Sequence, residues 1–348
     1  MVGSSRTVSS RTWLARQEIV TGERLQSLAD ISLVPLEVFS FHRHVERFAR
    51  EMILVESYAK LSDRDLARLS SKRVLFVYTH ALDGFIEHVW PQLDGESYTL
   101  LTHNSDDEIG ESRVAWIEEA GAKLRRWFAQ NTAVSHPKLT PLPIGIANSM
   151  WKHGNLRTLE RAVLRQKGTN KAENLFVGFD PRTHPARRDL LDALREQFVD
   201  LPAAAFRRQS FASYLDDLGR HTFCICPRGN GLDTHRFWEC LYLDVIPIVE
   251  RSDHVEHWRR CGLPVLVIDD FREVTPERLE AELPHISRRP GDRGMLLLSH
   301  YAQLLSDAAQ GSDYSEAASV TERHDPASSS VASTPAVHKR PRRGTSAH

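Results

Sequence analysis

Apolar runs and amphipathic stretches alternate along the second half of the chain. Four apolar runs predict buried strands, at 175–179, 222–226, 245–249 and 264–268. Three stretches have apolar residues at helical spacing, at 185–198, 210–218 and 234–243. Strands and helices that alternate in this way predict a parallel sheet with helices on both faces.

A second α/β region is expected between about residues 25 and 165. Its apolar runs at 73–78 and 98–101 predict buried parallel strands, and a helix is expected from about Glu111 to Phe128. Near the end of the chain, 295–308 carries one apolar stripe, made of Leu297, Leu298, Tyr301, Leu304 and Leu305. We expect this last helix to cross back to the first region.

The pattern therefore predicts two Rossmann-like domains that face each other across a cleft. The expected order is a flexible N-terminal segment (1–24), an acceptor-side domain (25–166), a linker (167–173), a donor domain with the return helix (174–310) and a tail (311–348). The tail is rich in Ser, Ala, Thr, Pro and charge, and it is predicted to be disordered because it has little apolar surface to bury.

Composition narrows the class of protein further. The 348 residues are 41% hydrophobic and 26% charged with a formal net charge of −1, so no overall field points to nucleic acid or to an anionic membrane. No run approaches the roughly 20 apolar residues of a transmembrane helix. The four cysteines (224, 226, 240 and 261) suggest packing residues in a reducing compartment, and Cys-x-Cys alone lacks the usual spacing of a zinc site.

The segment between the strand at 222–226 and the helix at 234–243 carries the clearest chemical signal. Its sequence, Pro-Arg-Gly-Asn-Gly, places Arg228 in a glycine-containing turn before a helix, and Arg228 can donate two hydrogen bonds to one phosphate. Arg236 and Glu239 share a face of that helix. A ligand with a phosphate end and a hydroxyl-bearing end, such as a nucleotide-sugar, suits this arrangement. The predicted nucleotide-sugar-binding residues are Arg228, Gly229, Asn230, Gly231, Asp233, Thr234, Arg236 and Glu239.

Simpler roles remain open for several of these residues. Asp233 or Thr234 can be present simply as the N-cap of the helix, without contacting a ligand. Arg236 and Glu239 can merely pair on a helix surface, which contributes only ~0.3–0.5 kcal/mol.

Three features of this segment carry a resemblance to a known family. Pro227-Arg228-Gly229, the Arg236-x-x-Glu239 pair and the strand Ile246-Pro247-Ile248 resemble the donor-binding signature of exostosin-like glycosyltransferases, in particular of their bacterial-type members. The likeness extends over roughly 174–285. One departure is Asp244, where the pattern has Gly; Asp tolerates the left-handed conformation, so the turn can survive.

The resemblance implies a GT-B glycosyltransferase with Arg236 near the phosphates and Glu239 on the ribose hydroxyls. It also implies a cytoplasmic enzyme, because the chain shows no membrane anchor. The implied reaction moves a sugar from a nucleotide-diphosphate-sugar to a hydroxyl acceptor, such as a glycan in polysaccharide biosynthesis.

A catalytic base is expected at the carboxyl ends of the first region's strands, where ligands of open α/β sheets collect. Each of the two strands runs into Thr-His, and the loop after the second is very polar. The candidates are Asp106, Asp107, His103 and His80, with Asp83 next, and Asp106 is preferred narrowly. Each of them can instead be an ordinary turn or capping residue.

No metal or other cofactor is predicted. Asp106-Asp107 and Asp269-Asp270 are adjacent pairs whose side chains diverge in an extended chain, so neither suits a metal-bound diphosphate. Arg228, Arg236 and the helix N-terminus can stabilise the leaving diphosphate instead. The alternative function is a non-catalytic nucleotide-sugar or sugar-phosphate binding protein. A kinase-type enzyme is disfavoured because the chain has no G-x-x-x-x-G-K-[ST] loop.

Overall fold

The computed structural model describes residues 14–166, 170–198, 209–287 and 293–311. Residues 1–13 of the predicted flexible segment, 167–169 of the predicted linker and nearly all of the predicted tail lie outside this description. None of the described helices is both long enough and apolar enough to cross a membrane.

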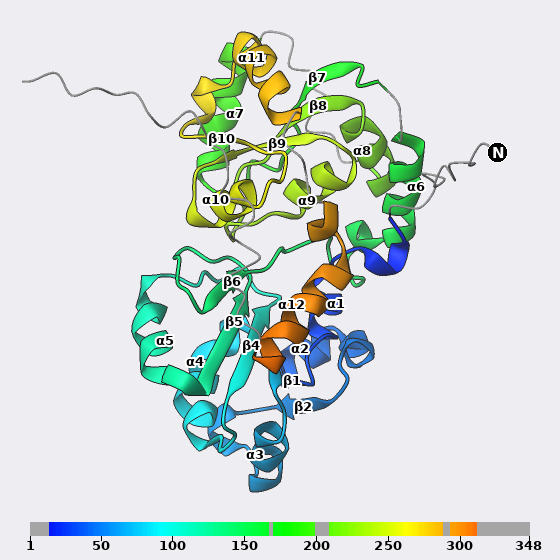
Figure 1. The fold of residues 1–348 in the computed structure, drawn as a ribbon. Coiled ribbons are helices and arrows are strands. Elements are labelled where there is room, and N and C mark those ends of the chain that lie inside the picture. The colour runs from blue at the N-terminus through cyan, green and yellow to red at the C-terminus, as the bar shows by residue number, and fades with distance from the viewer. Residues whose placement is uncertain (1–13, 167–169, 199–208, 288–292, 312–348) are drawn as a thin grey trace, which may run out of the picture. The chain divides into compact units, whose positions relative to one another are not determined.

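Two parallel sheets organise the described chain (Figure 1). The first has six strands in the spatial order β2 (Met52–Val55), β1 (Ile31–Pro35), β3 (Val74–Tyr78), β4 (Tyr98–His103), β5 (Leu124–Ala129) and β6 (Leu139–Pro141). The second has four, in the order β10 (Leu266–Ile268), β9 (Ile246–Glu250), β8 (His221–Ile225) and β7 (Glu173–Phe176). Every pairing in both sheets is parallel. The predicted α/β class with two parallel sheets is confirmed.

Helices connect the strands in both sheets. In the first half these are α1 (Gly22–Gln26), α2 (Leu36–Phe41), α3 (Asp63–Ser70), α4 (Leu82–Gly84), α5 (Val114–Ala120) and α6 (Leu156–Gln166). In the second half they are α7 (Ala186–Gln197), α8 (Phe211–Leu218), α9 (His235–Tyr242), α10 (Asp253–Arg260), α11 (Pro276–Ser287) and α12 (Leu298–Gln310). The turn after α9 holds Asp244 at φ 56°, so the residue does adopt the left-handed conformation that the family pattern assigns to Gly.

The helix expected over 111–128 is wrong in its second half. Helix α5 ends at Ala120, Gly121 takes a φ of +51°, and Leu124–Ala129 is strand β5 between β4 and β6. The apolar positions Leu124, Trp127 and Phe128 match a helical period as well as a buried strand, so periodicity alone could not separate the two. Gly121 is the sequence signal that the helix ends there.

The two faces of the second sheet bury different cores. Phe223 and Ile225 point to one face, whereas Cys224 and Cys226 point to the other, because side chains alternate along a strand. Helix α6 packs in the same core as Cys224, although it precedes the predicted linker. The boundaries proposed near residues 166 and 174 stay a prediction.

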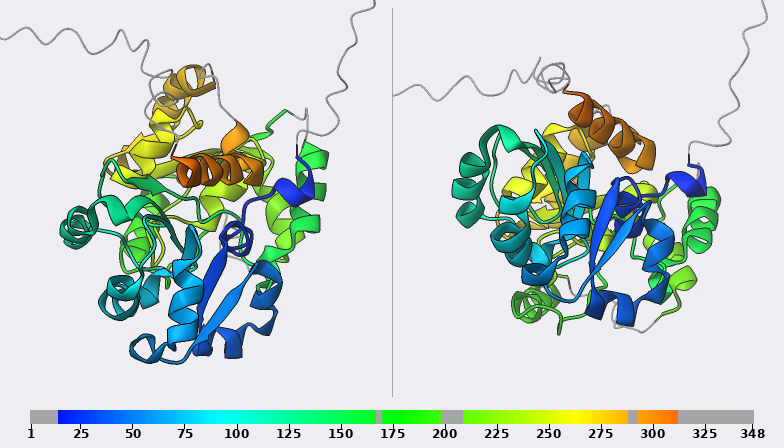
Figure 2. Two further views of the ribbon diagram at one scale, coloured as in Figure 1. Left: turned by 60° about the horizontal axis from the view of Figure 1, so that its bottom comes forward. Right: turned by 90° about the horizontal axis from the view of Figure 1, so that it is seen from below.

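Helix α12 returns from the second sheet to the first. The residues just before it, 293–296, contact α9, whereas α12 itself contacts β4, β5 and α1 (Figures 1 and 2). Tyr301, Leu304 and Leu305 are buried along one stripe. These contacts are the ones expected of a return helix, and the division into domains stays a prediction.

Candidate functional site

The loop from Pro227 to Thr234 leaves the carboxyl end of β8 and enters α9. Arg187 on α7 fixes its start, since its guanidinium donates to the carbonyl oxygens of Pro227 (2.9 Å) and Arg228 (2.7 Å). Burial, and then the charge of Arg236, lowers the pKa of Arg187 to about 10. The loop thus has a fixed path at the edge where open α/β sheets bind ligands.

Arg228 lies between two cavities at this edge. Both a cavity of about 130 Å³ beside α10 and one of about 220 Å³ beside α7 are lined by Arg228 and Glu250. The Nη2 of Arg228 pairs with Glu108 at 2.7 Å and donates to the carbonyl oxygen of Asn230 at 3.2 Å. Its Nε is buried and has no hydrogen-bond partner among the residues that the structure describes. A buried N–H donor without a partner costs about 1–3 kcal/mol, so this arginine is set up for an acceptor that a ligand can supply.

The loop's small and amide residues hold it against the first half. Gly231 lies so close to Asn131 that a Cβ at this position would be 2.6 Å from the Asn131 Nδ2, whereas a Cβ at Gly229 would meet only ordinary contacts. Asn230 donates from Nδ2 to Asp106 at 3.2 Å. Close backbone approach therefore explains Gly231 but not Gly229.

Asp233 is buried, and both of its carboxylate oxygens accept hydrogen bonds from within the protein. Its Oδ2 accepts from the Ile144 N–H at 2.8 Å and from the Trp238 indole at 2.8 Å, and it lies 3.3 Å from His254 Nε2. Its Oδ1 accepts from the Thr234 N–H at 2.8 Å. Thr234 is the N-cap residue of α9 by backbone conformation but makes no side-chain cap. Asp233 therefore joins the loop to the 142–145 segment of the first half, and its oxygens have little left to offer a ligand.

Arg236 and Glu239 line none of the three cavities described here, although the charge of Arg236 acts on Arg187, which lines one of them. Both bind the hydroxyl of Tyr214 on α8, which donates to Glu239 Oε2 at 2.7 Å and accepts from Arg236 Nε at 3.2 Å. Burial raises the pKa of Glu239 to about 6, against the opposing effects of the Tyr214 hydrogen bond and the Arg236 charge. Among the described residues, neither member of the pair bonds to Arg228, and their phosphate and ribose roles stay a prediction.

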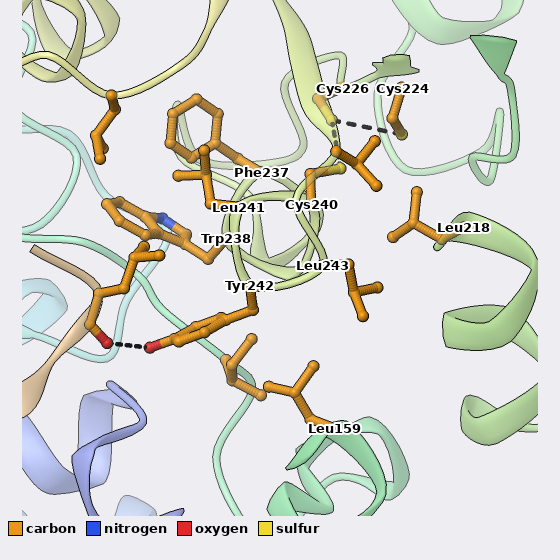
Figure 3. Close-up of a cluster of buried hydrophobic side chains, with 14 of the residues drawn as sticks. Leu159, Leu218, Cys224, Cys226, Phe237, Trp238, Cys240, Leu241, Tyr242 and Leu243 are labelled. Carbon is orange, nitrogen blue, oxygen red and sulfur yellow. Dashed lines mark hydrogen bonds between the residues drawn. The ribbon is translucent and has the colours of Figure 1, made fainter. Parts of the chain in front are cut away.

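Three of the four cysteines meet beneath α9 (Figure 3). The Sγ of Cys226 lies 3.7 Å from that of Cys224 and 3.8 Å from that of Cys240. All three Sγ atoms lie within 4.8 Å of one another, which sequence spacing did not indicate because Cys240 comes from the helix. They offer three of the four ligands of a structural zinc site, and they are also the small apolar packing residues that the sequence predicts.

The four predicted base candidates lie in different surroundings. His103 is buried, with Nε2 2.9 Å from the Pro143 carbonyl oxygen and Nδ1 accepting from the Asn104 N–H at 2.7 Å, and burial lowers its pKa to about 4. His80 is exposed and lies 4.0 Å from Glu37. Asp106 and Asp107 are both exposed in the loop after β4. Of the four, only His103 and Asp106 line a cavity described here, and His103 has both ring nitrogens engaged.

That cavity, of about 310 Å³, is the largest of the three described. Its wall includes Gln26, Asn104 and Asn148 from the first half, and His235 from the first turn of α9. Phe41 and Trp151 line it as well, and both are largely exposed. Sequence reasoning missed Gln26, Trp151 and His235, because they lie far apart in the chain and share no motif.

Comparisons with known proteins add two distant neighbours. No family model matches the chain, and no curated protein matches it. Among solved structures, the glycotransferase of kitacinnamycin aligns with a TM-score of 0.38 and 12% identity, over 89% of this chain and 96% of that one. The spinosyn forosaminyltransferase SpnP aligns with a TM-score of 0.37 and 11% identity, over 87% of this chain and 97% of that one.

Both neighbours are glycosyltransferases by name, but scores this low do not argue for a shared fold or activity. The function must therefore be argued from the site itself. The exostosin-like resemblance stays a prediction.

Proposed function

We propose that the protein is a GT-B-type glycosyltransferase that moves a sugar from a nucleotide-diphosphate-sugar to a hydroxyl acceptor. The observation that carries the proposal is the partnerless, buried Nε of Arg228, between two cavities at the carboxyl edge of a parallel sheet. A diphosphate oxygen supplies the acceptor that this N–H lacks, and the two cavities leave room on both sides for the rest of the donor. The exostosin-like signature around the same arginine supports this assignment.

The acceptor binds in the 310 Å³ cavity in this proposal. Its lining reaches the donor loop at His235 and at Asp106, which Asn230 contacts. Its polar groups are mostly amides and imidazoles, which suit hydroxyl groups better than phosphates. We propose that no divalent metal is needed, because Arg228 and the N-terminus of α9 can stabilise the departing diphosphate.

The competing function is a non-catalytic nucleotide-sugar or sugar-phosphate binding protein. It uses the same Arg228 edge but has no working base, so donor binding alone does not separate the two functions. Release of nucleoside diphosphate in the presence of a glycan or glycoside does.

The first test is a thermal-shift screen against UDP-, GDP-, ADP- and CMP-linked sugars. A ligand at 100 times its dissociation constant stabilises the fold by about 2.7 kcal/mol, which is easily measured. We expect one nucleotide class to shift the melting temperature in the wild-type protein and a smaller shift in Arg228→Ala. Absence of a shift with every donor would contradict the proposal.

A further inference from the structure

His235 is placed between the donor loop and the acceptor cavity. It is the first residue of α9, two positions after Asp233, and it lines the 310 Å³ cavity. Its Nδ1 lies 2.8 Å from the carbonyl oxygen of Gly145. A carbonyl oxygen can only accept a hydrogen bond, so this nitrogen must carry a proton. The neutral ring therefore carries its proton on Nδ1 and leaves the Nε2 lone pair free to accept another.

The Gly145 carbonyl is held firmly in this position. Gly145 has a φ of +65°, and a Cβ there would lie 2.5 Å from the carbonyl oxygen of Val20. Next to it, the Ile144 N–H donates to Asp233. The tautomer of His235 is thus fixed by a backbone segment that is itself tied to the donor loop.

The cavity beside His235 combines an aromatic rim with a polar wall. The exposed fractions of Phe41 and Trp151 are 72% and 48%, and their ring centroids lie 6.1 Å apart. A sugar ring has a C–H face that packs on such a surface and hydroxyls at its edge that need hydrogen bonds.

Deeper in the cavity, Gln26 supplies a donor for such a hydroxyl. Gln26 is fully buried and lines the cavity, and its Oε1 accepts from Tyr78 at 3.1 Å. Its Nε2 has no hydrogen-bond partner in the described part of the chain. A buried amide that lacks a partner indicates that a ligand group completes the site.

We propose that His235 is the base that deprotonates the acceptor hydroxyl, and that the acceptor is a sugar ring stacked on Trp151 with a hydroxyl on Gln26. This inference rests on the proposed glycosyl transfer. The acceptor O–H bond breaks and its proton moves to Nε2, while the acceptor oxygen bonds to the anomeric carbon. The bond from that carbon to the diphosphate breaks, and its electron pair leaves on the diphosphate.

The other candidates suit the role less well. The lone pair of His103 Nδ1 already accepts from a backbone N–H, and its other ring nitrogen faces a carbonyl oxygen. Asp106 is exposed and accepts from Asn230. Asp106 instead acts on His235 through its charge.

The pH profile follows from the groups around His235. Burial lowers its pKa, the Gly145 hydrogen bond opposes this, His153 lowers it further, and Asp233 and Asp106 raise it. His103 also lies close enough to interact with it. Because the base works only when neutral, kcat/KM falls on the acid side, with a midpoint below the 6.5 of an ordinary histidine.

The decisive variant is His235→Asn, whose amide can still donate to Gly145 but has no basic nitrogen. We expect turnover to fall by about 10²–10⁴, the usual share of a general base, while the donor-induced thermal shift stays unchanged. Asp107→Asn, at an exposed loop carboxylate that lines none of the described cavities, is the matched control and should keep wild-type turnover. Asp106→Asn should move the acid midpoint of kcat/KM to lower pH, because it removes a charge that raises the pKa of His235.

The sugar half is tested by acceptor kinetics with the donor present and by pyranoside binding without it. Trp151→Ala should raise the acceptor KM with little change in kcat, and Trp151→Phe should restore most of the loss, whereas Leu164→Ala, exposed on α6, should change neither. A panel of methyl pyranosides should change the tryptophan fluorescence of the wild-type protein and not that of Trp151→Phe.

The results separate the possible failures. Wild-type turnover in His235→Asn, or its loss in Asp106→Asn alone, overturns the assignment of the base. No fluorescence response to any pyranoside overturns the sugar site. A wild-type protein that binds donors but never releases nucleoside diphosphate contradicts the proposed function itself, and the base with it.

Discussion

The carboxyl edge of the second sheet and the cavity of the first half differ in charge. The edge carries arginines and carboxylates, with Arg228 pairing with Glu108 and leaving one N–H unused. The cavity wall contains mostly amides, imidazoles and aromatic rings, together with the carboxylates of Glu23 and Asp106. An edge with an arginine N–H to offer suits an anionic donor, whereas a wall rich in amides with an aromatic rim suits a ligand of hydroxyls and C–H groups. Two ligands of different chemistry are therefore expected to meet at the loop that joins these regions.

The largest effect is expected where the two regions are joined. Asp233→Asn places an amide N–H₂ among groups that donate to Asp233, including Ile144 and Trp238. Denaturant unfolding should show a loss of about 3–5 kcal/mol, the range for a buried charged network that loses one member. Asp216→Asn, at a partly exposed carboxylate paired with Arg165, serves as a control and should change stability by less than about 1 kcal/mol. A loss as small as that of the control would show that Asp233 does not hold the regions together.

Arg228→Ala should act on the charged edge alone. It removes the free N–H and should weaken nucleotide-diphosphate binding by about 1.5–3 kcal/mol, the range for hydrogen bonds to charged groups. Pyranoside binding in the 310 Å³ cavity should not change. Calorimetric titration measures both, and unchanged donor affinity in a folded variant would remove Arg228 from the donor site.

Tyr214→Phe tests whether the second arginine belongs to the same edge. The variant leaves Arg236 and Glu239 without their shared hydroxyl, so unfolding should be easier by about 1–3 kcal/mol. Donor affinity should stay the same, because neither residue lines the cavities that Arg228 lines. A clear drop in donor affinity would show that Arg236 and Glu239 take part in donor binding, as the family resemblance implies.

A smaller effect is expected from the ion pair that spans the two regions. Glu108 holds one Nη of Arg228, and both side chains are partly exposed. Glu108→Gln should strengthen donor binding by about two- to fivefold, since a partly exposed pair contributes only ~0.2–1 kcal/mol. Weaker binding in this variant would show that Glu108 takes part in donor recognition.

Chelation should have the smallest effect. Transfer is expected to persist in excess EDTA, because the arginine and the helix terminus stabilise the leaving diphosphate. Turnover rates with and without chelator provide the measurement. Loss of activity that manganese or magnesium restores would point instead to Asp106 and Asp107.

The same two regions show how far sequence reasoning reaches. Arg228 could be singled out because a strand, a glycine-containing loop and a helix follow one another directly in the chain. The strands at 73–78 and 98–101 were clear from continuous apolar runs, whereas β5 was mistaken for helix because Leu124, Trp127 and Phe128 match both periods. Local patterns therefore located the charged edge and most of the second sheet.

The 310 Å³ cavity could not be predicted from local sequence patterns. Gln26, Trp151 and His235 come from three distant segments, and only tertiary contact brings them to one cavity. The role of His235 depends on a carbonyl at Gly145, about 90 residues away, whose position follows from a left-handed backbone. Nothing near His235 in the sequence reports that contact.

Product formation tests the account most directly. Purified protein is incubated with the donor from the thermal-shift screen and the pyranoside from the fluorescence panel, and products are analysed by mass spectrometry. We predict one glycoside heavier by a single sugar residue, in equal amount to the nucleoside diphosphate released. Binding of both ligands without any such product would contradict glycosyl transfer and leave a nucleotide-sugar binding protein.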